Sequence, residues 1–208
     1  FYTHDRKKYL LRMYLFGVGM GVIDIICNNI YPDPVAMISN NIFVTLFLVG
    51  GIIWLIELRK KDNKKGLKYI GLFSVYQILT TILCILAGQL LPLTGMMSFI
   101  GAITANLIFN EGSFIFVLLG VLIYFNRTEP KRLIVAYGLF CLGFLALEWS
   151  IDPQSSALLY SNYQWMMIGS LPFMLMYNGE KGRGMKYLFY IFYPVHIVVL
   201  FFIGNIFF

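Results

Sequence analysis

Long runs of apolar residues alternate along this chain with short clusters of charged residues. A transmembrane helix needs about 20 apolar residues to cross the ~30 Å hydrocarbon core of a bilayer. Seven segments approach that length: Tyr9–Tyr31, Asn41–Leu58, Leu67–Leu91, Ser113–Phe125, Leu133–Ile151, Tyr163–Tyr177 and Tyr187–Phe207. The pattern predicts an all-α integral membrane protein, a bundle of about seven transmembrane helices forming one polytopic domain over residues 1–208.

A further apolar segment, Leu93–Phe109, lies between the third and fourth predicted spans. All 16 Lys and Arg residues fall in four loops, and with seven spans these loops lie on one side of the membrane. The positive-inside rule makes that side cytoplasmic. An eighth span would separate the basic loops, so we expect Leu93–Phe109 to be re-entrant or to lie at the outer surface. Re-entrant backbone must be satisfied by protein or by a water cavity.

The composition agrees with this interpretation. Hydrophobic residues make up 59% of the chain and charged residues only 12%, against about 25% charged in soluble domains. The net charge of +6 is explained by the positive-inside rule, and no basic helix interleaved with aromatic residues predicts a nucleic-acid partner. The start of the chain lacks the pattern of a signal peptide, and we expect upstream helices to be missing.

The three cysteines, Cys27, Cys84 and Cys141, are far apart and each lies in an apolar run. No CxxC pair or His/Cys cluster occurs, so neither a zinc site nor a disulfide framework is expected. We interpret the cysteines as small buried hydrophobic residues.

His196 is the most informative polar residue. It lies about ten residues into the last span, or ~15 Å from the cytoplasmic end of that span. Ionisable side chains at that depth are costly and usually mark a pathway or a reactive site. Pro194 removes a nearby helix hydrogen bond and frees a carbonyl. The alternative is a neutral histidine that hydrogen-bonds a neighbouring helix.

Other polar positions allow two interpretations each. Asn41 could cap a helix or face a polar cavity. Glu111 could be a general base or an outer-loop acid. Arg12 could snorkel to the cytoplasm, and Asp24 lies ~18 Å further along the same helix, so the two form no ion pair. Gly17 and Gly21 favour close helix packing.

The last part of the chain carries an ordered set of motifs. They run from Gln164-Trp165 to Leu171-Pro172, then Met176-Tyr177-Asn178-Gly179, then Gly182-Arg183-Gly184-Met185-Lys186-Tyr187-Leu188-Phe189-Tyr190, then Tyr193-Pro194-Val195-His196. This tail resembles the TraX family, whose members typically end in an LYNG-type turn, a basic Gly loop and an FY-x-FYP-x-H helix. Three earlier stretches are also similar to the family: His4 to Arg12, Asn41 to Leu46, and Glu111-Gly112 with Gly120-Val121-Leu122.

TraX-like proteins are named for a plasmid-encoded protein that N-acetylates pilin, and are grouped with multi-pass bacterial acyltransferases. The resemblance implies a chain in the bacterial cytoplasmic membrane that takes acetyl groups from acetyl-CoA. The positive-inside rule puts its N-terminus in the cytoplasm and, with seven spans, its C-terminus outside. The acceptor would be a peptide, glycan or lipid. Family members begin with two further helices, and a catalytic histidine is expected on the first of them.

For such a reaction we expect His196, Glu111 and Asn41 as catalytic residues. His196 would act as a base or orient one, and Asn41 would supply a hydrogen-bond donor. Four basic residues would hold the phosphates of the donor: Arg12, Lys181, Arg183 and Lys186.

Two other functions stay open. A transporter or channel component would use His196, Asp24 and Glu111 along a proton or substrate path, although no inverted repeat supports this. A non-catalytic subunit of a surface-assembly complex is the third.

Overall fold

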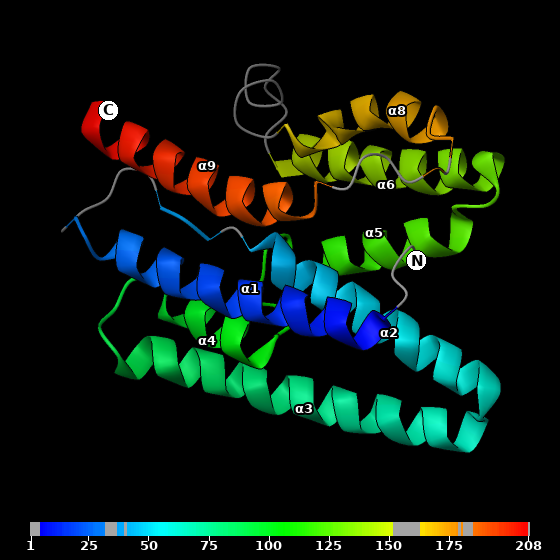
Figure 1. Cartoon of the computed structure of the whole chain (residues 1–208), viewed down its shortest axis with the longest axis horizontal. Helices are drawn as coiled ribbons and strands as arrows, with labels where there is room; N and C mark the ends of the chain where they lie inside the picture. Colours follow the sequence, from blue (N-terminus) through cyan, green and yellow to red (C-terminus); the bar gives the residue numbers. More distant parts are fainter. Residues whose placement is uncertain are drawn as a thin grey trace. The chain divides into compact units, whose positions relative to one another are not determined.

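The computed structural model describes residues 5–31, 37–39, 41–151, 163–178, 180 and 185–207. Within these residues the secondary structure is helical, with no strand. The helices are α1 (Arg6–Asn28), α2 (Ile42–Lys61), α3 (Asn63–Leu90), α4 (Met96–Thr104), α5 (Ser113–Asn126), α6 (Pro130–Ile151), the 3₁₀ helix η1 (Gln164–Ser170), α8 (Leu171–Leu175) and α9 (Lys186–Phe207) (Figure 1). The all-α class is confirmed.

Five helices of the described chain, rather than seven, are long and apolar enough to cross a membrane: α1, α2, α3, α6 and α9. The predicted span Ser113–Phe125 corresponds to α5, which has only 14 residues. The predicted span Tyr163–Tyr177 is divided into η1 and the five-residue α8. Pro172 lies in the first turn of α8, where its missing N–H costs no helical hydrogen bond, so it suits the start of a new helix after η1.

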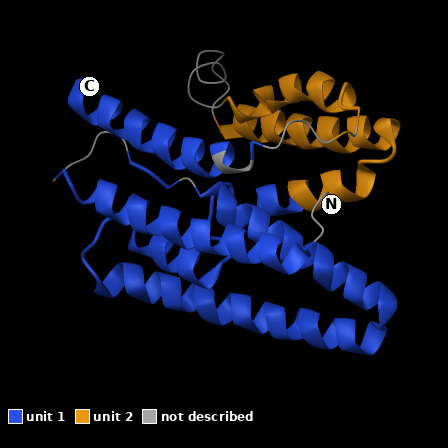
Figure 2. Ribbon diagram, in the orientation of Figure 1, with its two compact units in different colours: residues 1–118, 183–208 blue, residues 119–182 orange. Residues whose placement is uncertain are grey.

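The chain forms two compact units, coloured separately in Figure 2. Unit 1 comprises residues 1–118 and 183–208, and unit 2 comprises residues 119–182. The expectation of a single domain stays a prediction.

In unit 1, α1 and α9 run in the same direction. Phe16 stacks on Tyr190 with ring centroids 4.5 Å apart, and further along both helices Tyr31 meets Phe201 at 5.9 Å. α2 runs the opposite way, because Arg6 at the start of α1 pairs with Glu57 near the end of α2 at 2.6 Å. The starts of α1 and α3 and the end of α2 therefore lie at one end of the unit.

The two helices that begin at this end have the same cap. Asp5 accepts the Lys8 backbone N–H at 3.1 Å, and Asp62 accepts that of Lys65 at 3.0 Å. These N–H groups lower the pKa of both carboxyls, because they stabilise the ionised form. The caps start α1 and α3 beside the basic clusters that flank them.

The segment before α2 returns deep into unit 1. The Asn28 amide exchanges two hydrogen bonds with the backbone of Ile38, at 2.6 and 2.8 Å. Asn41 then donates to the Gly17 carbonyl at 2.8 Å, about 16 Å along α1 from its start. α2 therefore begins beside the middle of α1, rather than at its end.

α4 enters unit 1 rather than lying on its surface, and the side of the membrane to which Leu93–Phe109 returns stays a prediction. It starts near the end of α1, where the Thr94 N–H donates to Asn29 at 3.1 Å, and it ends beside Tyr14. Its nine residues extend ~13.5 Å, too short to cross. Ala105 has a φ of 47°, a left-handed conformation that ends the helix and turns the chain back.

Side chains from neighbouring helices satisfy the last carbonyls of this segment. Tyr14 donates to the Ile103 carbonyl at 2.7 Å, Tyr76 to that of Thr104 at 2.7 Å, and Gln77 to that of Ala105 at 3.2 Å. Because lipid cannot donate hydrogen bonds to free carbonyls, these contacts allow α4 to end inside the membrane.

Two glycines of α1 permit close packing, as expected. A Cβ at Gly17 would lie 2.7 Å from the Val44 side chain, and one at Gly21 would lie 2.8 Å from Ala102. Gly17 therefore lets α2 approach and Gly21 lets α4 approach.

In unit 2, the Tyr137 hydroxyl on α6 donates to the Met167 carbonyl at 2.9 Å and lies 2.7 Å from the Ser170 hydroxyl. These bonds hold η1 against α6. Glu148 on α6 is buried, and its Oε2 has no hydrogen-bond partner in the described part of the chain.

Candidate functional site

The main polar cluster of unit 1 lies where α2 begins, α9 passes and the loop between α4 and α5 meets them. It contains Glu111 from the loop, Asn41 and Thr45 from the start of α2, and Tyr193 and His196 from α9. Three chain segments far apart in sequence therefore meet beside the middle of α1.

Glu111 is held on several sides. The Tyr193 hydroxyl donates to its carboxylate at 2.7 Å, and the Asn41 backbone N–H also interacts with that carboxylate. The Thr45 hydroxyl contacts the Glu111 carbonyl at 3.0 Å and the Asn110 side chain at 3.2 Å. Glu111 is thus fixed inside unit 1, and the alternative of a free outer-loop acid does not fit this geometry.

Asn41 is the N-cap of α2, one of the two interpretations of its sequence position. Its Oδ1 accepts the Val44 N–H at 3.4 Å, while its Nδ2 donates to Gly17. Among the described residues only Gly17 accepts from Nδ2, and since an amide nitrogen carries two hydrogens, the second is unused there.

His196 lies beside this cluster. Its Nδ1 is 2.9 Å from the Phe192 carbonyl, and since a carbonyl only accepts, Nδ1 must carry the proton. In the neutral ring the lone pair is then on Nε2. The imidazole stacks on Phe192 at 5.0 Å, packs edge-on against Tyr193 at 5.4 Å, and is close enough to Glu111 for an electrostatic interaction.

Asp24 is a second buried acid near the cluster. Its side chain is only 5% exposed, and its Oδ1 has no hydrogen-bond partner among the residues described. It interacts electrostatically with Glu111 and with Tyr193. The sequence placed Asp24 near the outer edge of the first span and grouped it with Glu111 only in the alternative of a proton or substrate path.

The expected cofactor-binding residues are only partly visible. The Arg12 Nε is buried, with no hydrogen-bond partner in the described residues. Lys181 and Arg183 lie outside the described residues, and of Lys186 only the backbone, at the start of α9, is described. Their assignment to a phosphate-bearing donor stays a prediction.

A second polar cluster was missed from the sequence. Asn106 is fully buried and donates to the hydroxyls of Thr80 and Thr81 at 3.0 and 2.9 Å. Its side-chain oxygen Oδ1 accepts the N–H groups of Ile108 and Phe109 at 2.8 and 3.2 Å. With these partners Asn106 joins the re-entrant turn to α3, which is a structural role. The sequence signal that could have found this cluster is the amide of Asn106 and the hydroxyls of Thr80 and Thr81, which are polar positions in otherwise apolar runs.

Within the described ranges, no three His, Cys, Asp or Glu side chains are grouped as a metal site would require. Cys27, Cys84 and Cys141 are buried free thiols. The chemistry of the main cluster is therefore that of two carboxyls, an imidazole and a phenol at membrane depth, groups suited to moving protons.

Comparison with known proteins agrees with the resemblance of the tail motifs. Neither the curated proteins nor the solved structures gave a match. The family model described as TraX protein matches residues 1–204, so this chain belongs to the TraX family.

Proposed function

We propose that this chain is an acetyl-CoA-dependent membrane acyltransferase of the bacterial cytoplasmic membrane, acting on a surface-destined acceptor such as a pilin-like peptide or a glycan. The observation that carries the proposal is the meeting of Glu111, Tyr193 and His196 beside the middle of α1. Membership of the TraX family supports the proposal, because acetyl transfer is the activity implied for TraX-like proteins.

The neutral His196 ring is the base in this proposal. With Nδ1 donating to the Phe192 carbonyl, Nε2 can accept a proton from the hydroxyl or amine of the acceptor. The acceptor oxygen or nitrogen then bonds to the acetyl carbon of the thioester. As the C–S bond breaks, the proton on Nε2 passes to the thiolate that leaves, which releases acetylated acceptor and CoA.

Glu111 assists this step by its charge. When Nε2 takes a proton the ring becomes an imidazolium, and an ionised Glu111 nearby stabilises that charge. The Tyr193 hydroxyl fixes the direction of the carboxylate at 2.7 Å. The remaining amide hydrogen of Asn41 would be the donor for the oxyanion.

The donor would approach from the end of unit 1 where α1 and α3 start. At that end Arg12 supplies a buried Nε that no described residue uses. Lys181, Arg183 and Lys186 would complete the contacts with the phosphates of CoA. This end would be cytoplasmic by the positive-inside rule, with the C-terminus outside.

A proton or substrate path is the second candidate function. It is favoured by Asp24, which brings a second buried acid into electrostatic contact with Glu111 near His196. Such a path would carry protons across a vesicle membrane without acetyl-CoA. Measurement of internal pH in vesicles containing the protein separates this function from acyl transfer.

The direct test incubates the purified full-length protein with acetyl-CoA labelled in the acetyl group. The proposal expects label to move to an extracted peptide, glycan or lipid fraction, together with release of free CoA. Retention of all label in acetyl-CoA in the presence of cell-envelope extract would contradict it.

A further inference from the structure

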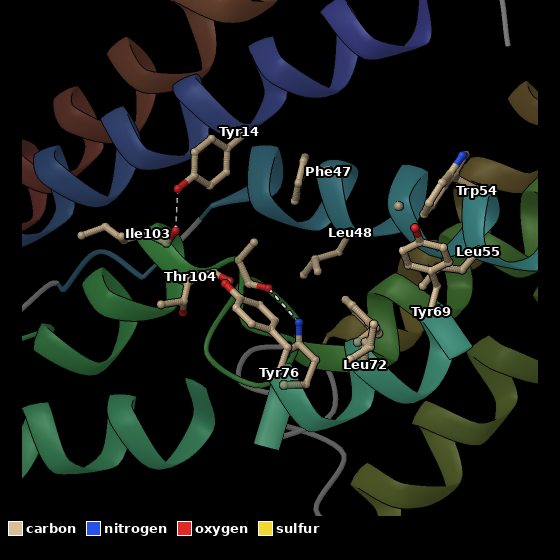
Figure 3. Close-up of a pocket in the computed structure, with 14 residues that line it drawn as sticks. Tyr14, Phe47, Leu48, Trp54, Leu55, Tyr69, Leu72, Tyr76, Ile103 and Thr104 are labelled. Carbon is tan, nitrogen blue, oxygen red and sulfur yellow. Dashed lines mark hydrogen bonds between the residues drawn. The ribbon is translucent and has the colours of Figure 1, made fainter. Parts of the chain in front are cut away.

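A recess in unit 1 lies apart from the polar cluster, between α1, α2, α3 and the end of α4 (Figure 3). Its volume of about 530 Å³ is within the roughly 300–1,000 Å³ typical of ligand pockets. Six aromatic side chains line it: Tyr14, Phe47, Trp54, Tyr69, Phe73 and Tyr76. None of the residues of the polar cluster is among its lining residues.

The polar groups at the inner end of the recess already have partners. The carbonyls of Ile103, Thr104 and Ala105 accept from Tyr14, Tyr76 and Gln77. Figure 3 shows Tyr14 directed at Ile103 at this end, and Trp54 beside Tyr69 at the other. An occupant therefore needs no polar group at the inner end, and an apolar chain satisfies the lining.

The recess is open along α3. Leu72 is 55% exposed, Tyr76 46% and Tyr69 45%. A lipid chain could therefore enter sideways from the bilayer, which a water-borne ligand could not do.

Helical periodicity extends the recess toward the α2–α3 connection. On α2 the lining residues Phe47, Gly51 and Trp54 are followed on the same face by Lys61, two turns (seven positions) after Trp54. On α3 the lining residue Tyr69 is preceded four positions earlier by Lys65. Both lysines are exposed, and Lys61 lies ~10 Å beyond Trp54 along the helix.

The charge of this connection complements an anion. Residues 59–68 contain six Lys or Arg and one Asp, a formal charge of +5. Basic clusters beside a transmembrane helix attract anionic lipid headgroups. Trp54 and Tyr69, whose rings meet edge-on at 5.9 Å, have the amphipathic character typical of the level between headgroups and hydrocarbon.

We propose that this recess binds one anionic phospholipid, with an acyl chain along the aromatic lining and its phosphate at Lys61 and Lys65. This lipid site does not depend on acyl transfer, since no residue of the polar cluster lines the recess.

The test uses the full chain in nanodiscs of phosphatidylcholine mixed with phosphatidylglycerol, and counts retained lipids by native mass spectrometry. We expect one phosphatidylglycerol per chain.

Gly51→Trp should remove this lipid, because Gly51 lines the recess and a larger side chain fills it. The helix should tolerate the change, since a Cβ at Gly51 meets no atom within 4 Å. Gly71→Trp is the matched control, being equally open but outside the lining, and should retain the lipid. Gly51→Leu repeats the test with a smaller side chain.

The headgroup is tested by Lys61→Gln with Lys65→Gln, which should lower the preference for phosphatidylglycerol about tenfold. Lys7→Gln with Lys8→Gln is the control, because Lys8 pairs with the capping Asp5 as Lys65 pairs with Asp62. Three results would overturn the proposal: retention of lipid by both Gly51 variants, equal retention of the two lipids by the unmodified chain, and displacement of the lipid by CoA.

Discussion

The Tyr193 hydroxyl donates to the Glu111 carboxylate at 2.7 Å, although 82 positions separate the two residues along the chain. The same hydroxyl accepts the Ile42 N–H at 3.2 Å. Tyr193 therefore joins α9 to both the start of α2 and the loop before α5.

Tyr193→Phe removes this connection and keeps the ring. We expect a loss of about 1–2 kcal/mol in stability, more than the ~0.6 kcal/mol average of membrane hydrogen bonds, because a buried carboxyl loses its donor. Thermal unfolding of the detergent-purified protein measures it. Tyr190→Phe is the control, since Tyr190 lies one turn earlier on α9 and its ring contacts do not need the hydroxyl. Equal unfolding temperatures for the two variants would speak against the role of the Tyr193 hydroxyl.

Gly21→Leu tests the approach of α4 to α1. A Cβ at Gly21 would lie 2.8 Å from the Ala102 Cβ, so a larger side chain must displace the re-entrant helix. The expected cost is about 1–3 kcal/mol, typical of overpacking. Gly19→Leu makes the same change where nothing lies within 4 Å, and helix propensity should leave it neutral or stabilising. Similar thermal stability of the two variants would argue against the packing of α4 on α1.

The arrangement of α4 and α5 predicts on which side of the membrane Leu91, Asn63 and Asn126 lie. α4 and α5 have 9 and 14 residues, and their summed length of ~35 Å suffices for one crossing between them. In a cysteine-free background, Leu91→Cys should react with an impermeant thiol reagent on intact cells. Asn63→Cys and Asn126→Cys should react only after the membrane is opened. Labelling of Asn126→Cys on intact cells would contradict a single crossing by the two half-length helices.

Asn106→Ala tests the structural cluster at the turn. The change leaves the N–H groups of Ile108 and Phe109 without their acceptor inside the protein, so we expect a loss of about 2–4 kcal/mol. Asn126→Ala is a suitable control, because Asn126 donates within its own helix to the Leu122 carbonyl at 2.8 Å. If expression level and unfolding temperature were unchanged in Asn106→Ala, the turn would not depend on this residue.

The long spans could be predicted because their apolar runs alone make them helical and membrane-buried. Hydropathy does not show where a chain turns inside the membrane. Ala105 ends α4 through a backbone conformation, and the carbonyls released there are satisfied by Tyr14 and Tyr76 on other helices. These contacts depend on tertiary packing, so Leu93–Phe109 could be recognised as unusual only from the distribution of charge.

The candidate site, too, could be predicted only in part: single residues could be proposed from the sequence, but their contacts could not. His196 and Glu111 could be proposed singly, because ionisable residues in apolar surroundings are costly. Their connection through Tyr193 could not be predicted, since it depends on α2 starting beside Gly17 and on α9 running parallel to α1. Asp24 was expected near an outer edge and, in the alternative function, on a path with Glu111, and the packed structure brings the two acids within electrostatic range of each other.

Two isosteric changes distinguish catalysis from structure at the main cluster. Glu111→Gln keeps an oxygen that can accept from Tyr193, and His196→Gln keeps hydrogen-bonding capacity near the Phe192 carbonyl. Neither change should unfold the protein. Glu129→Gln makes the first change at an exposed acid that pairs with Arg132 and should leave the rate unchanged.

The most direct measurement is the rate of acetyl transfer from labelled acetyl-CoA by the full-length protein and by its His196→Gln variant, at matched abundance and matched unfolding temperature. If Nε2 of His196 takes the acceptor proton, the rate should fall by about 10²–10⁴-fold in the variant. A variant of normal stability that transfers acetyl groups at the rate of the unmodified protein would contradict the catalytic role of His196.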